Sequence, residues 1–149
     1  MSDQLKFKIG LSGTYYGEKK PEYSVTVNDV EYAHGTIVTP SNETEFIEFT
    51  VELEDGDNVL GIHFLNKVNE DVLKDNYEDP DNYTIIGDIL LNVESIEIDD
   101  IDLGNLRHSA SKFIPLEHPV IEACVNLGHK GKYVLGFTTP FYIWLLESM

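Results

Sequence analysis

The segment from Asn66 to Asp88 concentrates oxygen-bearing side chains that could bind a cation. Between residues 67 and 88 there are seven carboxylates and two lysines. Ca²⁺ in proteins takes about six to eight oxygen ligands from such groups. The segment lacks the spacing of an EF-hand loop, so a calcium site would be assembled from the loop and the flanking strand ends. The available donors are Asn66, Asn69, Glu70, Asp71, Asp75, Asn76, Glu78, Asp79, Asp81, Asn82 and Asp88.

Two tyrosines, Tyr77 and Tyr83, lie within this acidic segment. An exposed aromatic ring beside polar groups can stack on the apolar C–H face of a sugar. The same rings can equally hold the segment against the rest of the domain. The carboxylates also have a simpler interpretation, because a block of like charges usually repels itself and stays hydrated. A ligand-binding loop and a solvated insertion are therefore both open.

Motifs for catalysis are not found in the chain. It contains no Gly-rich phosphate loop followed by a helix, no G-x-S-x-G elbow and no H-E-x-x-H pair. Carboxylates are so abundant that none stands out as the acid–base pair of a glycosidase. His63 lies within an apolar strand pattern, which favours a hydrogen-bonded structural histidine over a ligand. We therefore expect a binding protein and not an enzyme, with a glycan-active enzyme as a disfavoured alternative.

The composition excludes several classes of partner. Twenty-seven acidic and ten basic residues give a net charge of −17, which repels phosphate backbones and argues against nucleic-acid binding. An acidic DNA mimic is a minor alternative. Cys124 is the single cysteine, so no internal disulfide and no Cys-based zinc site is expected. The N-terminus has no signal-peptide pattern, and the longest uncharged run (133–146) is shorter than a membrane span of about 20 residues.

Alternating hydrophobic residues predict strands along most of the chain. The stretches 5–11 and 22–27 both alternate with a period of two. Asn28-Asp29 follows and suits a tight turn, because both residues tolerate positive φ. Between residues 46 and 53 the alternation slips by one residue after Phe46, which predicts a β-bulge. In the stretch 88–106 neither face is uniformly apolar, which predicts a shift of register.

About eight short strands separated by turn signals are typical of an all-β protein built as an antiparallel β-sandwich. A chain of 149 residues is ordinarily one domain. We therefore predict a single β-sandwich domain over residues 1–149.

Three strings then resemble a known family: VTVNDVEYAHGTI, EFTVELEDGDNVLGIHFLN and GDILLNVESIEIDDIDLG. Together they are similar to the calcium-dependent xylan-binding class of carbohydrate-binding modules. The resemblance covers about residues 5–106 and implies a jelly-roll sandwich that binds a polysaccharide or other glycan. Residues 107–149 would supply extra strands or a docking tail.

The resemblance also implies site residues. Asn66 matches the asparagine that ends one family element, and Asp88 matches the aspartate that opens the next. In the family such positions lie beside a calcium ion that also binds sugar hydroxyls. The family's next acid is replaced by Lys67, and the asparagine expected after Asp88 is replaced by Leu90. The expected site therefore has Ca²⁺ held by Asn66, Asp71, Asp75 and Asp88, with Tyr77 and Tyr83 contacting the carbohydrate.

The C-terminal residues form the most apolar stretch of the sequence. Residues 133–146 are interpreted as the last core strand or, alternatively, as a docking strand for an oligomer or larger assembly. Phe141, Tyr142 and Trp144 would make that contact. Together with Lys67 and Leu90, this tail supports an alternative function as a structural protein, for example of a phage particle. The sequence leaves the compartment open, and a virion or the cytoplasm would suit this alternative.

Overall fold

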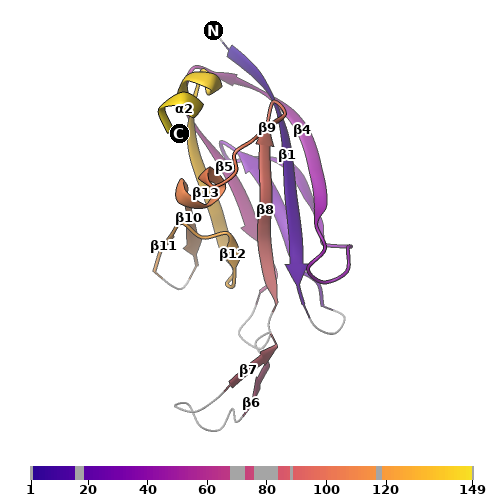
Figure 1. Cartoon of the computed structure of the whole chain (residues 1–149). Coiled ribbons are helices and arrows are strands. Elements are labelled where there is room, and N and C mark those ends of the chain that lie inside the picture. The colour runs from indigo at the N-terminus through magenta and orange to yellow at the C-terminus, as the bar shows by residue number, and fades with distance from the viewer. Residues whose placement is uncertain are drawn as a thin grey trace.

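Two antiparallel β-sheets, packed face to face, make up most of the molecule (Figure 1). They are seen in a computed structural model that describes residues 2–15, 19–67, 73–75, 84–87, 89–116 and 119–148. The all-β antiparallel sandwich predicted from the sequence is confirmed. The connections repeatedly pass from one sheet to the other, because successive strands such as β4 and β5 belong to different sheets.

Sheet A has β1 (Ser2–Thr14) between β4 (Glu45–Glu54) and β8 (Leu90–Ile98). The short strands β12 (Asn126–Leu127) and β9 (Ile101–Asp102) both pair with β8. The alternation of β1 places Leu5, Phe7, Ile9 and Leu11 in the core, each no more than 1% exposed. Residues between them, such as Lys6 and Lys8, point to the outer face of sheet A, the side away from sheet B.

Sheet B has the order β11-β10-β13-β5-β2-β3. In chain order its strands are β2 (Glu22–Val27), β3 (Val30–Thr36), β5 (Gly56–Phe64), β10 (Ser111–Pro115), β11 (Ile121–Glu122) and β13 (Gly131–Thr139). The C-terminal third of the chain thus supplies β13, an interior strand paired with both β5 and β10. A separate two-stranded hairpin is formed by β6 (Leu73–Asp75) and β7 (Thr84–Gly87).

Two sequence expectations for turns and register are confirmed. The turn between β2 and β3 has Asn28 and Asp29 at φ of 51° and 67°, in the left-handed region that these residues tolerate. In β8 the buried residues change from Leu91 and Val93 to Ile96 and Ile98. The pairing of β8 with β1 shifts at the same point, which leaves Glu94 as the extra residue.

The bulge predicted after Phe46 is wrong. The pairing of β1 with β4 runs without a shift from Glu45 to Glu54, so Phe46 and Phe49 lie on opposite faces of sheet A. Phe46 is 57% exposed on the outer face. Phe49 points inward, where its ring stacks on Phe7 and on Tyr32 of β3, each at 5.2 Å between centroids. The slip in the hydrophobic pattern therefore reflects an exposed aromatic residue.

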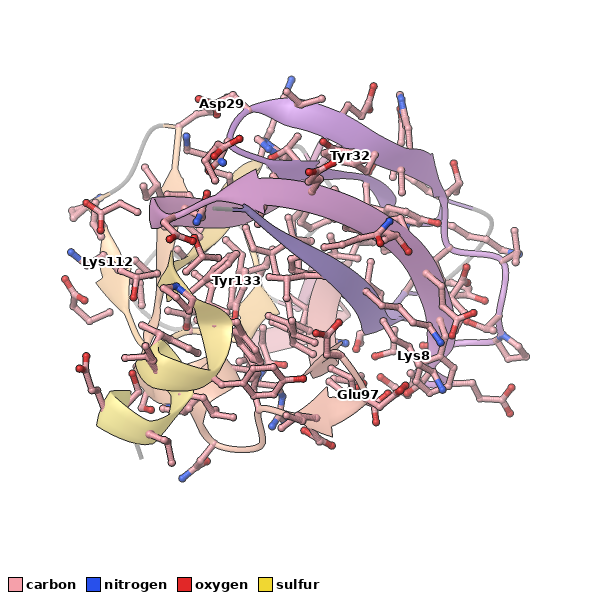
Figure 2. The ribbon with its side chains drawn as sticks, turned by 90° about the horizontal axis from the view of Figure 1, so that it is seen from above. Lys8, Asp29, Tyr32, Glu97, Lys112 and Tyr133 are labelled. Atoms are coloured by element: carbon pink, nitrogen blue, oxygen red, sulfur yellow. The ribbon has the colours of Figure 1, made fainter. Side chains whose placement is uncertain are left out.

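The described residues also form two short helices, α1 (Leu106–Ser109) and α2 (Phe141–Ser148). Tyr133 of β13 is fully buried inside the sandwich (Figure 2). Its hydroxyl donates to the carbonyl of Arg107, which fixes α1 against sheet B. Burial also raises the pKa of the Tyr133 hydroxyl. In the described parts of the chain, no helix has the length and apolar character needed to cross a membrane.

The C-terminal stretch is only partly a strand. β13 ends at Thr139, and α2 folds over the end of the sandwich that also holds the N-terminus (Figure 1). Phe141 is fully buried, and its ring lies 5.9 Å from that of Trp144, which is partly buried. The prediction of Phe141 as a contact residue is therefore wrong, because its side chain belongs to the core. Tyr142 is 53% exposed and stays a predicted contact.

Candidate functional site

The acidic segment leaves the sandwich at one end, which we call the loop end. There β1 finishes at Thr14, β5 finishes at Phe64, and β8 begins at Leu90. The registers place these positions together, since Thr14 pairs with Leu90 and Phe64 pairs with both Tyr23 and Gly131. Figure 1 shows the β6–β7 hairpin beyond this end, opposite α2. The loop end is where side chains from several connections can reach one ligand.

Asn66 is fixed at the base of the acidic segment by two hydrogen bonds. Its Oδ1 accepts from the backbone N–H of Glu22 at 2.9 Å, and its Nδ2 donates to the carbonyl of Lys20, also at 2.9 Å. Both bonds extend the attachment of β5 to β2 past the last strand pair. A carboxamide oxygen has two lone pairs, so one remains for another donor or a cation.

Lys67 lies directly after Asn66 and is only 6% exposed. A buried ammonium group is unfavourable unless it finds hydrogen-bond acceptors. The Nζ of Lys67 donates to the carbonyl oxygen of Ile89 at 2.6 Å. Because Ile89 immediately precedes β8, this bond joins the two ends of the stretch that carries the acidic residues. The loop end thus holds a fixed positive charge at the base of an acidic segment.

The other predicted site residues cannot be placed beside Asn66. Asp71, Tyr77, Tyr83 and Asp88 fall outside the described residues. Asp75 ends β6, and its backbone pairs with Thr84 of β7, but the structure does not describe its side chain. These assignments stay predictions.

A calcium site does not fit the residues that the structure does describe at this end. The buried ammonium of Lys67, the residue directly after Asn66, would repel a cation bound nearby. Across the described ranges, no three His, Cys, Asp or Glu side chains gather closely enough to hold a metal ion. Any calcium site would have to be built from the carboxylates between Lys67 and Ile89.

Sequence analysis missed an aromatic residue at the loop end. Tyr15 follows β1, and its hydroxyl donates to the carbonyl of Thr39 at 2.9 Å. Its backbone N–H donates to the hydroxyl of Ser41 at 3.1 Å, and the Nζ of Lys20 lies 5.7 Å from its ring centroid. The residue directly after an alternating strand was the available signal. Through its bonds to Thr39 and Ser41, Tyr15 holds the connection between β3 and β4 against the end of β1.

The structural interpretation of His63 is confirmed. Its Nε2 lies 3.2 Å from the hydroxyl of Thr26 on the neighbouring strand β2. Burial, and then the positive charge of Lys132, lower the pKa of His63 below its ordinary value of 6.5. The lowered pKa favours the neutral ring, which acts as a hydrogen-bonding element of sheet B.

His34 on β3 has the opposite electrostatics. Its Nε2 lies 2.9 Å from a carboxylate oxygen of Glu22, and its Nδ1 lies 3.2 Å from one of Glu31. The hydrogen bond to Glu22 raises the pKa of His34, and the charges of both carboxylates add to that effect. This exposed cluster favours an imidazolium ion between two acids, which is an ion pair and not a nucleophile–base arrangement.

A comparison with solved structures finds the same fold in a carbohydrate-binding module. This is vCBM60 in complex with galactobiose, which matches with a TM-score of 0.53 over 88% of this chain and 97% of the other. The two sequences are 10% identical over the alignment, so the likeness concerns the fold. Searches against family models and against curated proteins gave no match.

Proposed function

We propose that this chain is a non-catalytic carbohydrate-binding module that recognises a polysaccharide at its loop end. The observation that carries the proposal is the fold, which is shared over 88% of the chain with a module that binds a disaccharide. The absence of recognisable catalytic motifs from the sequence adds to it. The bonds of Asn66 and Lys67 provide a fixed base for the segment that would meet the ligand.

The acidic segment supplies groups suited to a neutral sugar. Tyr77 and Tyr83 would stack on the apolar faces of sugar rings. Asp71, Asp75 and Asp88 would accept hydrogen bonds from hydroxyl groups, and bonds to a charged acceptor are stronger than neutral ones. This recognition needs no covalent step and leaves the polysaccharide unchanged. Xylan is the first ligand class to test, because the sequence resembles xylan-binding modules.

Affinity gel electrophoresis tests the proposal directly. Wild-type protein should migrate more slowly in gels that contain soluble xylan or soluble galactan than in gels without polysaccharide. An acidic protein of similar size with no glycan-binding activity serves as the control for sieving. Equal mobility in every gel would remove the proposed function.

Calcium assistance is a separable part of the proposal and rests on the carboxylates between Lys67 and Ile89. At a calcium concentration about 100 times the dissociation constant, a specific site should raise the free energy of unfolding by about 2.7 kcal/mol. Asp88→Ala should abolish this gain. If the unfolding curves in calcium and in chelator overlap, calcium assistance is contradicted, and the proposal of a glycan-binding module stays without calcium.

A second candidate function is assembly, and one observation favours it. Tyr142, Ile143 and Leu146 of α2 are 53%, 55% and 75% exposed, which gives the helix an apolar outer face. The chain would then serve as a structural protein of a larger particle, as in a phage. Light scattering should show a concentration-dependent oligomer that Leu146→Asp dissolves. A monomer at all concentrations would contradict assembly through self-association.

A further inference from the structure

Phe46 forms an exposed aromatic surface on the outer face of sheet A. Phe46 is 57% exposed, and its ring lies against Gly10 of the neighbouring strand β1. A Cβ atom on Gly10 would come within 3.2 Å of Cε1 of Phe46 and within 2.5 Å of Oγ of Ser95. The glycine therefore lets an aromatic edge and a hydroxyl group approach the same point of the backbone.

Lys8 and Glu97 lie beside one side of the Phe46 ring. The Nζ of Lys8 lies 4.7 Å from the centroid of the Phe46 ring and 3.9 Å from a carboxylate oxygen of Glu97. Figure 2 shows Lys8 and Glu97 beside each other on this side of the molecule. The lysine charge is thus shared between the aromatic face and a neighbouring acid.

A hydrogen-bond network fixes polar groups along the same face. Asn92 of β8 is 5% exposed, and its Nδ2 donates to the hydroxyl groups of Ser12 at 3.2 Å and Thr14 at 3.0 Å. Ser12 donates onward to Oε1 of Glu94 at 2.6 Å, and Thr14 donates to Oδ1 of Asn42 at 2.6 Å. Both chains of bonds start at a buried amide and end at exposed side chains, Glu94 and Asn42.

The direction of these bonds has a chemical consequence. Each hydroxyl already uses its proton inside the protein, so Glu94 and Asn42 are held in place before any ligand arrives. Among the described residues, the second carboxylate oxygen of Glu94 and the amide N–H groups of Asn42 make no other hydrogen bond, so they can bind a ligand. Groups that are fixed in advance lose little conformational entropy on binding. The bulge in β8 is what brings Glu94 next to Ser12, opposite the point where β1 shifts register.

We propose that this Phe46 surface (Asn42, Phe46, Glu94 and Ser95, supported by the buried residues Gly10, Ser12 and Asn92) is a binding surface for a neutral polysaccharide, separate from the acidic segment. The inference rests on the proposed function, because it names the same class of ligand. An aromatic ring beside fixed donors and acceptors matches a sugar, which has an apolar C–H face and a rim of hydroxyl groups. Phe46 stacks on one sugar ring, and Glu94 and Asn42 bind hydroxyl groups of the chain.

The surroundings favour a neutral glycan over other occupants. The Phe46 surface combines one aromatic ring with polar groups, whereas the core of a protein interface is usually a contiguous apolar patch. A second copy of a chain with a net charge of −17 would be repelled electrostatically. An anionic polysaccharide would be repelled for the same reason, and the nearby lysine already faces Glu97.

The decisive experiment compares Phe46→Ala with Leu116→Ala in binding to soluble xylan and soluble galactan. Leu116 is 70% exposed and follows β10 on sheet B, so its truncation removes a similar exposed hydrophobe from the other sheet. Phe46→Ala should weaken binding about tenfold to whichever of the two polysaccharides the wild type binds. Leu116→Ala should bind as wild type. Both variants should unfold at the wild-type midpoint, because neither side chain is in the core.

Glu94→Gln provides a second variant that keeps an acceptor for the Ser12 hydroxyl and removes the charge. It should weaken binding several-fold, because a neutral acceptor makes weaker hydrogen bonds than a carboxylate. Wild-type affinity in both Phe46→Ala and Glu94→Gln would overturn this inference and leave the proposed function standing. An equal loss in Leu116→Ala would overturn it as well. Failure of the wild type to bind either polysaccharide would overturn both.

Discussion

Lys67 is one of two residues at which the chain departs from the family it resembles. An acid was expected after Asn66, and the sequence could show only that a positive charge stood there. The structure adds that the ammonium is buried and bonded to the carbonyl of Ile89 at 2.6 Å. The charged side chain of Lys67 therefore joins the two ends of the acidic stretch through its bond to Ile89. A lysine among carboxylates would otherwise be interpreted as a surface charge.

Replacing Lys67 by methionine tests this role. Methionine fills similar volume but leaves the carbonyl of Ile89 without this donor, and losing one partner of a buried hydrogen bond costs about 1–3 kcal/mol. Urea unfolding should show that loss. Lys112→Met is the matched control, since its Nζ lies 3.8 Å from Glu122 in an exposed pair and its removal should cost at most about 0.5 kcal/mol. Equal stability of the two variants would contradict the structural role of Lys67.

The two histidines of sheet B should titrate on opposite sides of the ordinary value of 6.5. The raised pKa of His34 means that its protonated form stabilises the fold below pH 6.5, and this contribution is lost as the pH rises through the raised value. His63 has a lowered pKa, so stability is lost as the pH falls below 6.5 toward that value. NMR titration of the ring protons measures both. A pKa for His63 above that of His34 would contradict the assigned surroundings.

At the scale of elements, the alternation of hydrophobic residues predicted where the strands lie. It predicted less well which face of the sheet each side chain occupies. The strands β1 and β2 follow directly from period-two patterns, and their inward residues are buried as expected. In β4 the pattern contained Phe46 and Phe49, and hydrophobicity alone assigned both to the core. Only the register with β1 shows that Phe46 faces outward. An exposed aromatic residue is indistinguishable from a bulge in sequence, because both break the alternation by one position.

Residues 133–146 also show that the hydrophobic pattern alone does not determine the local structure. Residues 133–146 are uncharged, which indicated one long strand, but pairing with β5 and β10 stops by Thr139 and Pro140 precedes a helix. The order of buried and exposed residues in α2 then follows packing on β13. The candidate site in the acidic segment could be predicted as a composition, whereas the bonds of Asn66 and Tyr15 depend on residues distant in sequence.

Adjacent aromatic residues in α2 give a direct test of that packing. Phe141 is fully buried against Trp144, and Tyr142 is 53% exposed. Phe141→Ala should lower the free energy of unfolding by about 3–5 kcal/mol, because it removes core contacts and leaves a cavity. Tyr142→Ala should lower it by less than about 1 kcal/mol. Chemical denaturation measures both, and a larger loss in Tyr142→Ala would contradict the orientation of the helix.

At the scale of the whole molecule, the net charge limits the kinds of polysaccharide that could bind. A net charge of −17 repels anionic polymers, so we expect the proposed polysaccharide ligand to be neutral. Binding to a neutral glycan depends on stacking and hydrogen bonds, so raising the salt concentration should change the affinity by less than about twofold. Gel retardation in low and high salt measures this. A steep fall with salt would indicate an ionic partner, including the basic partner expected of a DNA mimic.

We propose that this β-sandwich binds a polysaccharide and does not cleave it. Titration calorimetry of the wild-type protein with xylan and galactan oligosaccharides tests it most directly when the same samples are assayed for new reducing ends. We predict saturable heat with at least one oligosaccharide and no increase in reducing ends during prolonged incubation. Absence of saturable binding, or sustained release of reducing ends that a single carboxylate substitution abolishes, would contradict the account.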